Sequence, residues 1–236
     1  MNDIPNQAPT ATPADALRVA QARVLTARPR RPGRLAQLLF STMDLVYGKA
    51  LTLERFEALE LIARVPYQAW ESVGYVAITH THERPRFARR IFDYVRESRA
   101  AQDNEQWHLL ILEELVAQAG RPRHWLRARL IPQLLALFYY HVSWLLYVIA
   151  PRLSYALNAD FEDHAEHGYM QYVAEHPELD RVVWVSSFQR DYGVYATVGD
   201  VLRRIALDEG EHRDESLARI EVARFPRESL ERVSVA

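Results

Sequence analysis

The sequence predicts an all-α protein with a single domain. From Leu35 onward, apolar residues recur at spacings of three and four, and no segment alternates strictly enough to predict a strand. A chain of 236 residues is long enough for one sizeable core and short for two. With 49% hydrophobic and 25% charged residues, its composition is that of a globular protein.

The apolar spacing predicts the helices in order. They are expected over about 35–47, 53–80, 86–119, 126–157, 159–175 and 197–222, with breaks at Pro85, Gly120 and the Gly193 to Gly199 region. Residues 1–34 are rich in alanine, proline and arginine and have helical character only over 14–25, so we expect a flexible N-terminal arm. Residues 225–236 are expected to form a C-terminal tail, which leaves 35–224 as the folded domain.

Charge and composition exclude several function classes. The net charge of -2 provides no general attraction to nucleic acid, so no nucleic-acid partner is expected. The chain has no cysteine, which excludes disulfides, thiolate metal ligands and a cysteine nucleophile. Any metal must therefore be held by oxygen and nitrogen atoms. The first fifteen residues contain Asp3 and Asp15 and no apolar stretch, so we expect no signal peptide and a cytoplasmic location.

The segment 130–150 is unusually apolar, with 21 residues and no formal charge. Its length would allow it to cross a membrane. Pro132, Gln133 and His141 lie inside it, however, and arginines flank both of its ends. We expect a helix that lies in the membrane interface, with a buried core helix or a membrane span as the alternatives.

Two Glu-x-x-His pairs are candidates for metal binding. Of the nine histidines, two follow a glutamate by three residues: His108 follows Glu105, and His212 follows Glu209. Residues three apart share a helix face, and both pairs lie on faces that are otherwise apolar. Burying an unpaired carboxylate costs on the order of several kcal/mol, so these acids need a partner. A divalent metal ion is the simplest one.

Four-helix proteins with two irons combine two such pairs with a single glutamate on each of two further helices. Glu60 and Glu162 lie on the apolar faces of two other predicted helices. Each alone is as easily interpreted as a solvated or ion-paired residue. Their joint occurrence favours six ligands to two iron ions: Glu60, Glu105, His108, Glu162, Glu209 and His212.

Five long stretches resemble the alternative oxidases, and most closely their plastid terminal oxidase branch. The stretches are LELIARVPYQAW (59–70), NEQWHLLILEEL (104–115), FYYHVSWLLYVIAPRLSYAL (138–157), FEDHAEHGY (161–169) and DVLRRIALDEGEHRD (200–214). The resemblance implies a ferritin-like four-helix bundle with a di-iron centre and additional membrane-interface helices. It also implies a monotopic, usually dimeric enzyme that oxidises quinol, reduces dioxygen to water and pumps no protons. In a bacterium, it would lie on the cytoplasmic face of the inner membrane.

The resemblance also assigns roles to individual residues. The six matched ligand positions are those found above, and Tyr169 matches a redox-active tyrosine, although a core aromatic is the alternative. The matched quinol pocket comprises Arg55, Leu59, Phe161 and Ala165. Asn104 and Asp208 match residues that orient the ligands, although either could be a surface residue. Leu61, His164 and Gly168 depart from the family pattern near the pocket, so the identity of the quinol stays open.

Structural roles are expected for His124, His141, His164 and His167, and solvated faces for Glu113, Glu114 and Glu211. Glu71, also on an apolar helix, is the less favoured rival to Glu60 as a ligand. Three alternative functions remain at this point. One is a di-iron hydroxylase that inserts oxygen into the quinone ring, and another is a metal-free helical protein of the membrane surface. An iron store is less favoured, because the apolar segment 130–150 would be costly on a soluble shell.

Overall fold

The computed structural model describes residues 12–120 and 125–223, and these ranges form helices and no strand. The elements are α1 (Ala14–Thr26), α2 (Arg34–Tyr47), α3 (Leu53–Thr81), α4 (Pro85–Gln118), η1 (Leu126–Leu130), α5 (Ile131–Ile149), α6 (Pro151–Glu175), η2 (Pro177–Asp180), α7 (Gln189–Tyr192) and α8 (Val198–Glu221). The predicted all-α fold is confirmed.

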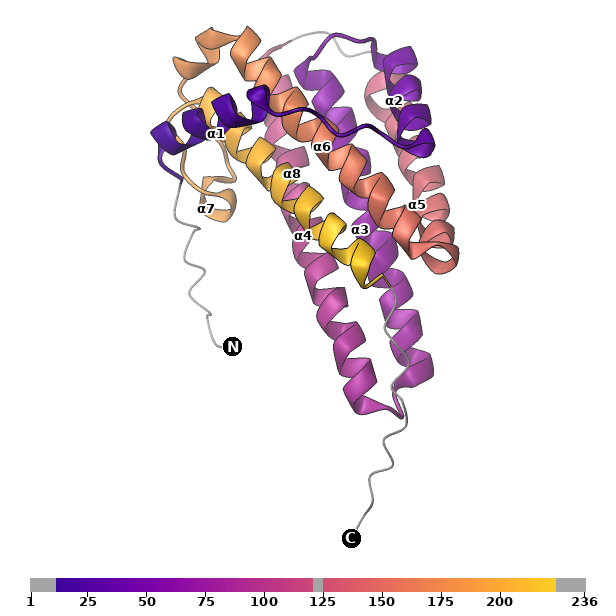
Figure 1. Cartoon of the computed structure of the whole chain (residues 1–236). Coiled ribbons are helices and arrows are strands. Elements are labelled where there is room, and N and C mark those ends of the chain that lie inside the picture. Colours follow the sequence, from indigo (N-terminus) through magenta and orange to yellow (C-terminus); the bar gives the residue numbers. More distant parts are fainter. Residues whose placement is uncertain (1–11, 121–124, 224–236) are drawn as a thin grey trace.

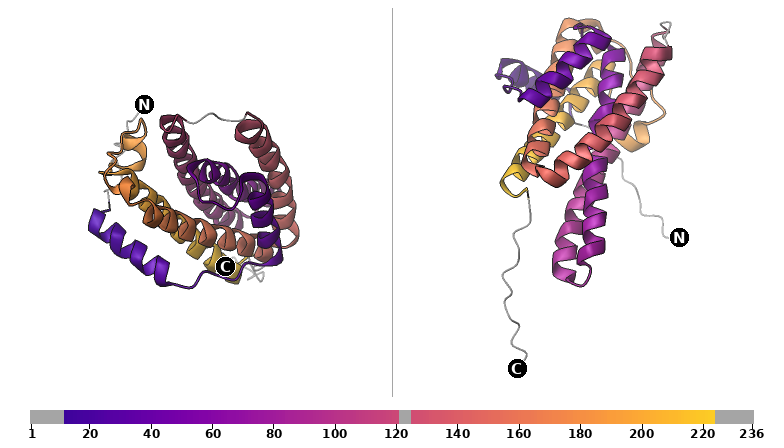
Figure 2. Two further views of the ribbon diagram at one scale, coloured as in Figure 1. Left: turned by 90° about the horizontal axis from the view of Figure 1, so that it is seen from above. Right: turned by 90° about the vertical axis from the view of Figure 1, so that its right-hand side faces the viewer.

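Four long helices form the centre of the molecule. Helix α3 packs along α4, and α6 packs along α8, while α5 lies against α3 (Figure 1). Seen from above, the two pairs face each other around a common interior (Figure 2, left). Large apolar side chains such as Phe56, Ile111 and Ile205 fill this interior and are fully buried. The hairpin of α3 and α4 continues beyond the end of α8 (Figure 1).

Local sequence signals fix where the central helices begin. The hydroxyl of Thr52 accepts a hydrogen bond from the backbone N–H of Arg55 (3.2 Å), and Thr197 accepts one from Asp200 (3.1 Å). Such caps satisfy backbone N–H groups that have no partner within the helix. Pro85 is the first residue of α4, where its fixed φ and missing N–H are tolerated. The starts of α3, α4 and α8 are therefore readable from sequence.

The single helix expected over 126–157 is wrong. Residues 126–130 form a π-helical turn, and α5 ends at Ile149. Ala150 leaves the helical conformation (φ -139°, ψ 68°), and α6 begins at Pro151. The physical reason is the proline ring, which clashes with a helical residue directly before it. The break expected near 158 is absent, so α6 runs unbroken from Pro151 to Glu175.

The expected flexible arm needs correction over its described part. Helix α1 lies across α6 and α8, with Leu17 fully buried (Figure 1). The side-chain amide of Gln21 donates to the carbonyl of Met170 (2.8 Å) and accepts from Arg203 (2.8 Å). Because these partners lie far away in the sequence, local composition could not indicate them. Residues 1–11 of the arm and the predicted tail 225–236 lie outside the described residues.

Helix α5 exposes a continuous apolar face. Leu134, Leu137, Phe138, Leu145 and Ile149 are each more than half exposed, and Pro132 and Ser143 are the buried residues of this helix. The segment Leu126–Ile149 is long and apolar enough to cross a membrane by length and composition. Figure 2, right, shows α5 and α2 together in front of the bundle. The opposite side of α5 packs on α3.

Candidate metal centre

The six predicted ligands converge at the centre of the bundle. They come from α3, α4, α6 and α8, and their exposed fractions are at most 1% except for His212, at 7%. They form two overlapping groups, each with ligand atoms within 4.8 Å of one another: Glu60, Glu105, His108 and Glu209, and Glu105, Glu162, Glu209 and His212. Glu105 and Glu209 belong to both groups. The arrangement is that of two adjacent sites that share two carboxylates.

The two Glu-x-x-His pairs face each other across the site. The Nδ1 atom of His108 lies 3.0 Å from the carboxylate of Glu209, and that of His212 lies 2.7 Å from Glu105. His108 Nδ1 is also 3.6 Å from Glu60. The three-residue spacing places each acid and imidazole on one helix face, and α4 and α8 turn these faces toward each other. Each histidine therefore approaches the glutamate of the opposite helix.

The donor atoms fit a pair of metal ions. Within the described part of the chain, eight nitrogen and oxygen atoms of the six side chains are buried without a hydrogen bond. They are Glu60 Oε2, both carboxylate oxygens of Glu105 and of Glu209, Glu162 Oε2, and Nδ1 of His108 and of His212. Buried polar atoms without partners are costly and rare. Four carboxylates and two imidazoles form a donor set that suits iron and related cations.

Electrostatics leads to the same conclusion. Burial, with the charge of Glu105 nearby, raises the pKa of Glu60 to about 8 and that of Glu162 to about 7, and burial raises the pKa of Glu209 well above its usual value. Burial also opposes ionisation of Glu105, but the neighbouring imidazoles of His108 and His212 hold its pKa below the usual range. So many carboxylates in a low-dielectric interior need protons or cations to neutralise them.

Two buried tyrosines contact the two single glutamates. The hydroxyl of Tyr169 donates to the carboxylate of Glu60, and the hydroxyl of Tyr67 donates to Glu162 (2.8 Å). Burial and the neighbouring carboxylates raise both tyrosine pKa values well above 10, so both phenols are protonated at neutral pH. Sequence reasoning found Tyr169 and missed Tyr67. The available signal was its position seven residues after Glu60, the spacing that also separates Glu162 and Tyr169.

His108 has a charged partner on its outer side. Its Nε2 atom lies 3.2 Å from Asp208, which also accepts a hydrogen bond from Tyr192 (2.5 Å) and pairs with Arg204. Burial works to raise the pKa of Asp208, but its contact with His108 holds it below the usual value. Asp208 is therefore placed to orient the imidazole. Tyr192 lies in the short helix α7, whose 4 residues are too few for a repeating spacing of apolar residues to indicate its role.

Asn104, the other residue predicted to orient a ligand, makes no hydrogen bond to one through its side-chain oxygen. Asn104 directly precedes Glu105, but its side-chain oxygen is buried without a hydrogen-bond partner. Instead, Asn158 lies next to Glu162: its amide nitrogen is 2.9 Å from Glu162 Oε1, 2.9 Å from Tyr67 and 3.1 Å from Ser216. Sequence reasoning missed Asn158, although it lies one helical turn before Glu162.

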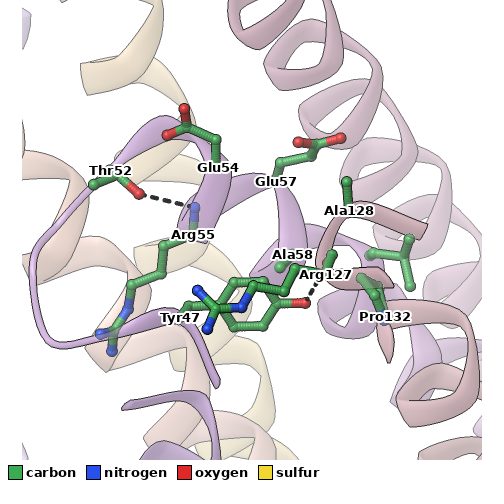
Figure 3. Close-up of a pocket in the computed structure, with 10 residues that line it drawn as sticks. Tyr47, Thr52, Glu54, Arg55, Glu57, Ala58, Arg127, Ala128 and Pro132 are labelled. Carbon is green, nitrogen blue, oxygen red and sulfur yellow. Dashed lines mark hydrogen bonds between the residues drawn. The ribbon is translucent and has the colours of Figure 1, made fainter. Parts of the chain in front are cut away.

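The residues of the expected quinol pocket are separated. Arg55 pairs with Asp44 (2.9 Å), donates to the carbonyl of Gly48 and lines a cavity of about 280 Å³ between α2, α3 and the start of α5 (Figure 3). The cavity is lined also by Tyr47, Thr52, Glu54, Glu57, Ala58, Leu61, Arg127, Ala128 and Pro132. Leu59, Phe161 and Ala165 are buried and do not line this cavity. The reason is helical geometry, because Ala58 and Leu61 occupy a different face of α3 from Leu59.

Several other acids and histidines have structural contacts. Glu71 forms an ion pair with Arg99, and Glu114 accepts a hydrogen bond from the backbone N–H of Ser187. His141 contacts the carbonyl of Leu137 one turn earlier, and the ring of His164 stacks on Phe40 (4.2 Å between centroids). His124 lies outside the described residues.

One further acidic group lies outside the centre. His167 lies near Asp163 and Glu166, a trio that could hold a cation. All three residues come from α6, and Arg213 already pairs with both acids. This group therefore has its countercharge from the protein.

The fold and site define a helical bundle with a buried carboxylate and imidazole centre suited to a pair of metal ions. The family model described as "Alternative oxidase" matches residues 18–218, and this chain belongs to the alternative oxidase family. It is 34% identical over 139 residues to "Ubiquinol oxidase 4, chloroplastic/chromoplastic" of Arabidopsis thaliana. That match spans 59% of this chain and 36% of the relative. The predicted resemblance is confirmed.

Proposed function

We propose that this protein is a membrane-associated quinol oxidase, which transfers electrons from quinol to dioxygen at a di-iron centre, forms water and pumps no protons. The observation that supports this proposal most directly is the convergence of six buried ligands with eight donor atoms that have no hydrogen bond. Membership of the alternative oxidase family and the relative named as a ubiquinol oxidase support the substrate class.

Each of the two groups of ligands would bind one iron ion. Glu60 and His108 would bind one iron, and Glu162 and His212 would bind the other, with Glu105 and Glu209 shared. When bound, the irons supply the electron-transfer chemistry of dioxygen reduction. The protein contributes a water-poor interior and fixed orientations, because every ligand is buried.

Tyr169 is positioned for electron transfer coupled to proton transfer. Its hydroxyl donates to Glu60, and its ring stacks on Phe56 with 4.1 Å between centroids. If Tyr169 loses an electron, its phenolic proton has an acceptor already in contact, the Glu60 carboxylate. The stack on Phe56 keeps the ring in the orientation that maintains this contact. These contacts support a redox role over that of a purely structural core aromatic.

The cavity beside Arg55 is our candidate for the quinol head group. Its polar lining includes Arg55, which pairs with Asp44, and Tyr47, whose hydroxyl donates to the carbonyl of Arg127 (3.1 Å; Figure 3). Ala58, Leu61 and Pro132 provide apolar surface. A quinol ring needs this combination of apolar walls and a few polar groups. The buried residues Leu59 and Phe161 directly precede Glu60 and Glu162 in the chain, so the expected pocket residues adjoin the metal ligands.

We also propose that α5 lies in the membrane interface as a monotopic anchor, on the cytoplasmic face of the inner membrane in a bacterium. One face of α5 is apolar and exposed, while the other packs on α3, where Tyr140 bonds Ser72 (3.1 Å). A membrane span would have to leave the bundle and lose these contacts. Arginines near both ends of α5 would meet lipid head groups. The homodimer expected from the resemblance remains part of this proposal.

The membrane proposal is tested on the exposed face. Leu137→Asp combined with Phe138→Asp places two charges on the outer side of α5, where both residues are exposed. We expect co-sedimentation with anionic lipid vesicles to fall by about tenfold or more, with unchanged iron content. The matched control is Val194→Asp, at an exposed apolar residue outside α5. Unchanged vesicle binding of the double variant would contradict the proposal.

The activity is tested by iron analysis together with oxygen uptake on ubiquinol and plastoquinol analogues. We expect about two irons per chain, dioxygen consumption and unmodified quinone as the organic product. Oxygen inserted into the quinone ring would instead identify a hydroxylase. Many irons per chain without quinol oxidation would identify an iron store, and an active protein free of metal would refute the di-iron proposal.

A further inference from the structure

A second cavity adjoins the metal centre on the side away from the cavity beside Arg55. It has a volume of about 520 Å³, and its walls come from α3, α4, α6 and the last turns of α8. Figure 1 shows that α3 and α4 run past the end of α8, which carries the lining residues Ala218, Arg219 and Val222 at its C-terminal end. The two cavities share no lining residue, so they are separate openings in the bundle.

The inner wall of the second cavity is bonded directly to the metal centre. Tyr67 lines the cavity and donates to Glu162 (2.8 Å). Ser216 lines it as well and lies 3.1 Å from the amide of Asn158, which is itself 2.9 Å from Glu162. A single layer of polar side chains thus separates this cavity from a proposed iron ligand.

The mouth of the cavity is charged. Arg219 of α8 pairs with Glu97 of α4 and lies over the ring of Tyr94, 3.7 Å from its centroid. The side chain of Glu97 is 54% exposed, and the cavity rim also carries the exposed Glu215. A mouth of this kind opens to water, in contrast to the apolar outer face of α5.

The proposed reaction needs such an opening. Two quinols and one dioxygen give two quinones and two waters, so four hydrogen atoms leave quinol and two water molecules are formed at the site. The ligands there are buried, with His212 the most exposed at 7%. The second cavity has polar groups at its inner wall and its mouth, with aromatic side chains such as Trp70 and Tyr155 between them. Buried water needs about two to four polar partners, and these two polar regions can supply them. Resting on the proposed function, we propose that the second cavity is the route by which water exchanges between the metal centre and bulk solvent.

The absence of cysteine from the chain makes a reversible plug possible. Ser98→Cys places the sole thiol on the cavity wall, at a residue outside the metal centre. A water-soluble methanethiosulfonate then attaches a group to this thiol, and a reducing agent removes it. The matched control is Ala100→Cys, at an exposed residue two positions along α4 that does not line the cavity. Both thiols are expected to react in the folded protein.

Water exchange is measured on protein loaded with Mn²⁺, through the relaxation of oxygen-17 in the solvent. We expect modification of Ser98→Cys to slow this exchange about tenfold, and reduction to restore it. In the iron-loaded enzyme, a plug that makes product release limiting should lower kcat and KM together and leave kcat/KM for quinol and for dioxygen unchanged. Modified Ala100→Cys should behave as the unmodified protein. If Ser98→Cys folds poorly, Ala218→Trp at the exposed rim provides a permanent plug.

Three results would overturn the inference. Unchanged water exchange after complete modification would show that water leaves elsewhere. A raised KM for dioxygen with unchanged water exchange would make the cavity a gas channel instead. Unmodified protein that binds neither manganese nor iron would remove the proposed function together with the inference, whereas the first two results would leave the proposed function intact.

Discussion

The metal centre has two halves that carry nearly the same residues: α3 and α4 form one half, and α6 and α8 form the other. Helices α3 and α6 each carry a glutamate and, seven residues later, a tyrosine that contacts the glutamate of the other helix. Helices α4 and α8 each carry a Glu-x-x-His pair whose imidazole approaches the glutamate of the other helix. Two pairs of helices therefore contribute equivalent ligands from opposite sides, although the chain shows no sequence repeat beyond these elements.

The halves differ in what surrounds these parts. His108 contacts Asp208, which is held by Tyr192 and Arg204, whereas Asn104, at the equivalent place before Glu105, leaves its side-chain oxygen without a partner. On the other half, two neutral side chains donate to Glu162: Asn158, and Tyr67, which also lines the second cavity. Equal ligand sets thus receive unequal electrostatic support, and we expect unequal contributions to binding and catalysis.

The largest loss of iron and of activity is expected from variants of the glutamates that belong to both ligand groups. Glu105→Ala removes a carboxylate that belongs to both groups, so iron content should fall from about two per chain to near zero, and quinol oxidation should be lost. Helicity, measured by circular dichroism, should be retained. The control is Glu71→Ala, which removes an acid paired with Arg99 outside the centre and should leave iron content unchanged. Full iron content in the Glu105 variant would contradict the shared role.

The reciprocal tyrosines give a matched pair of variants. Tyr169→Phe should lower kcat on the order of 100-fold at constant iron content, because the variant cannot pass a phenolic proton to Glu60. Tyr67→Phe removes one hydrogen bond to Glu162 and should lower kcat by only about threefold. Rates come from oxygen uptake and iron content from metal analysis. Equal losses in the two variants would show that the halves are functionally alike.

The outer contacts of the two Glu-x-x-His pairs are compared by metal affinity. Asp208→Asn weakens the orienting contact to His108 and should lower iron affinity by about 10-fold. Asn104→Ala should change it by less than about twofold, because the asparagine oxygen makes no hydrogen bond. Competition with a calibrated chelator measures both variants. A larger loss in the Asn104 variant would reverse the assigned difference.

The smallest effect concerns the metal-free protein. The raised pKa values of Glu60 (about 8), Glu162 (about 7) and His212 (about 9) add stability that is complete below their ordinary values of 4.5 and 6.5. This stability is lost as pH rises through the raised values. Chelated protein should therefore melt several degrees lower at about pH 9 than at about pH 6, as followed by circular dichroism. Iron-loaded protein should depend less on pH because cations replace the protons, and an equal dependence would contradict this account.

Much of this centre could be predicted because its chemistry follows helical spacing. Glu105 with His108, and Glu209 with His212, share helix faces by their separation alone, and apolar neighbours indicate which face is buried. Tyr192 and Ser216 could not be found in this way, since their contacts come from separate elements. The four residues of the expected quinol pocket stay a prediction: Arg55 lines a cavity that Leu59, Phe161 and Ala165 do not line, because which face of α3 meets α5 is set by packing.

The sequence by itself determined the helical class, the starts of α3, α4 and α8, and the identity of the metal-ligand candidates, because these depend on local period, capping and residue chemistry. Tertiary structure alone decided that Tyr67 and Tyr169 cross to each other's helix, that α1 docks through Gln21, and that a second cavity adjoins Glu162. These features arise from contacts between residues far apart in the chain, whose geometry depends on how whole helices pack.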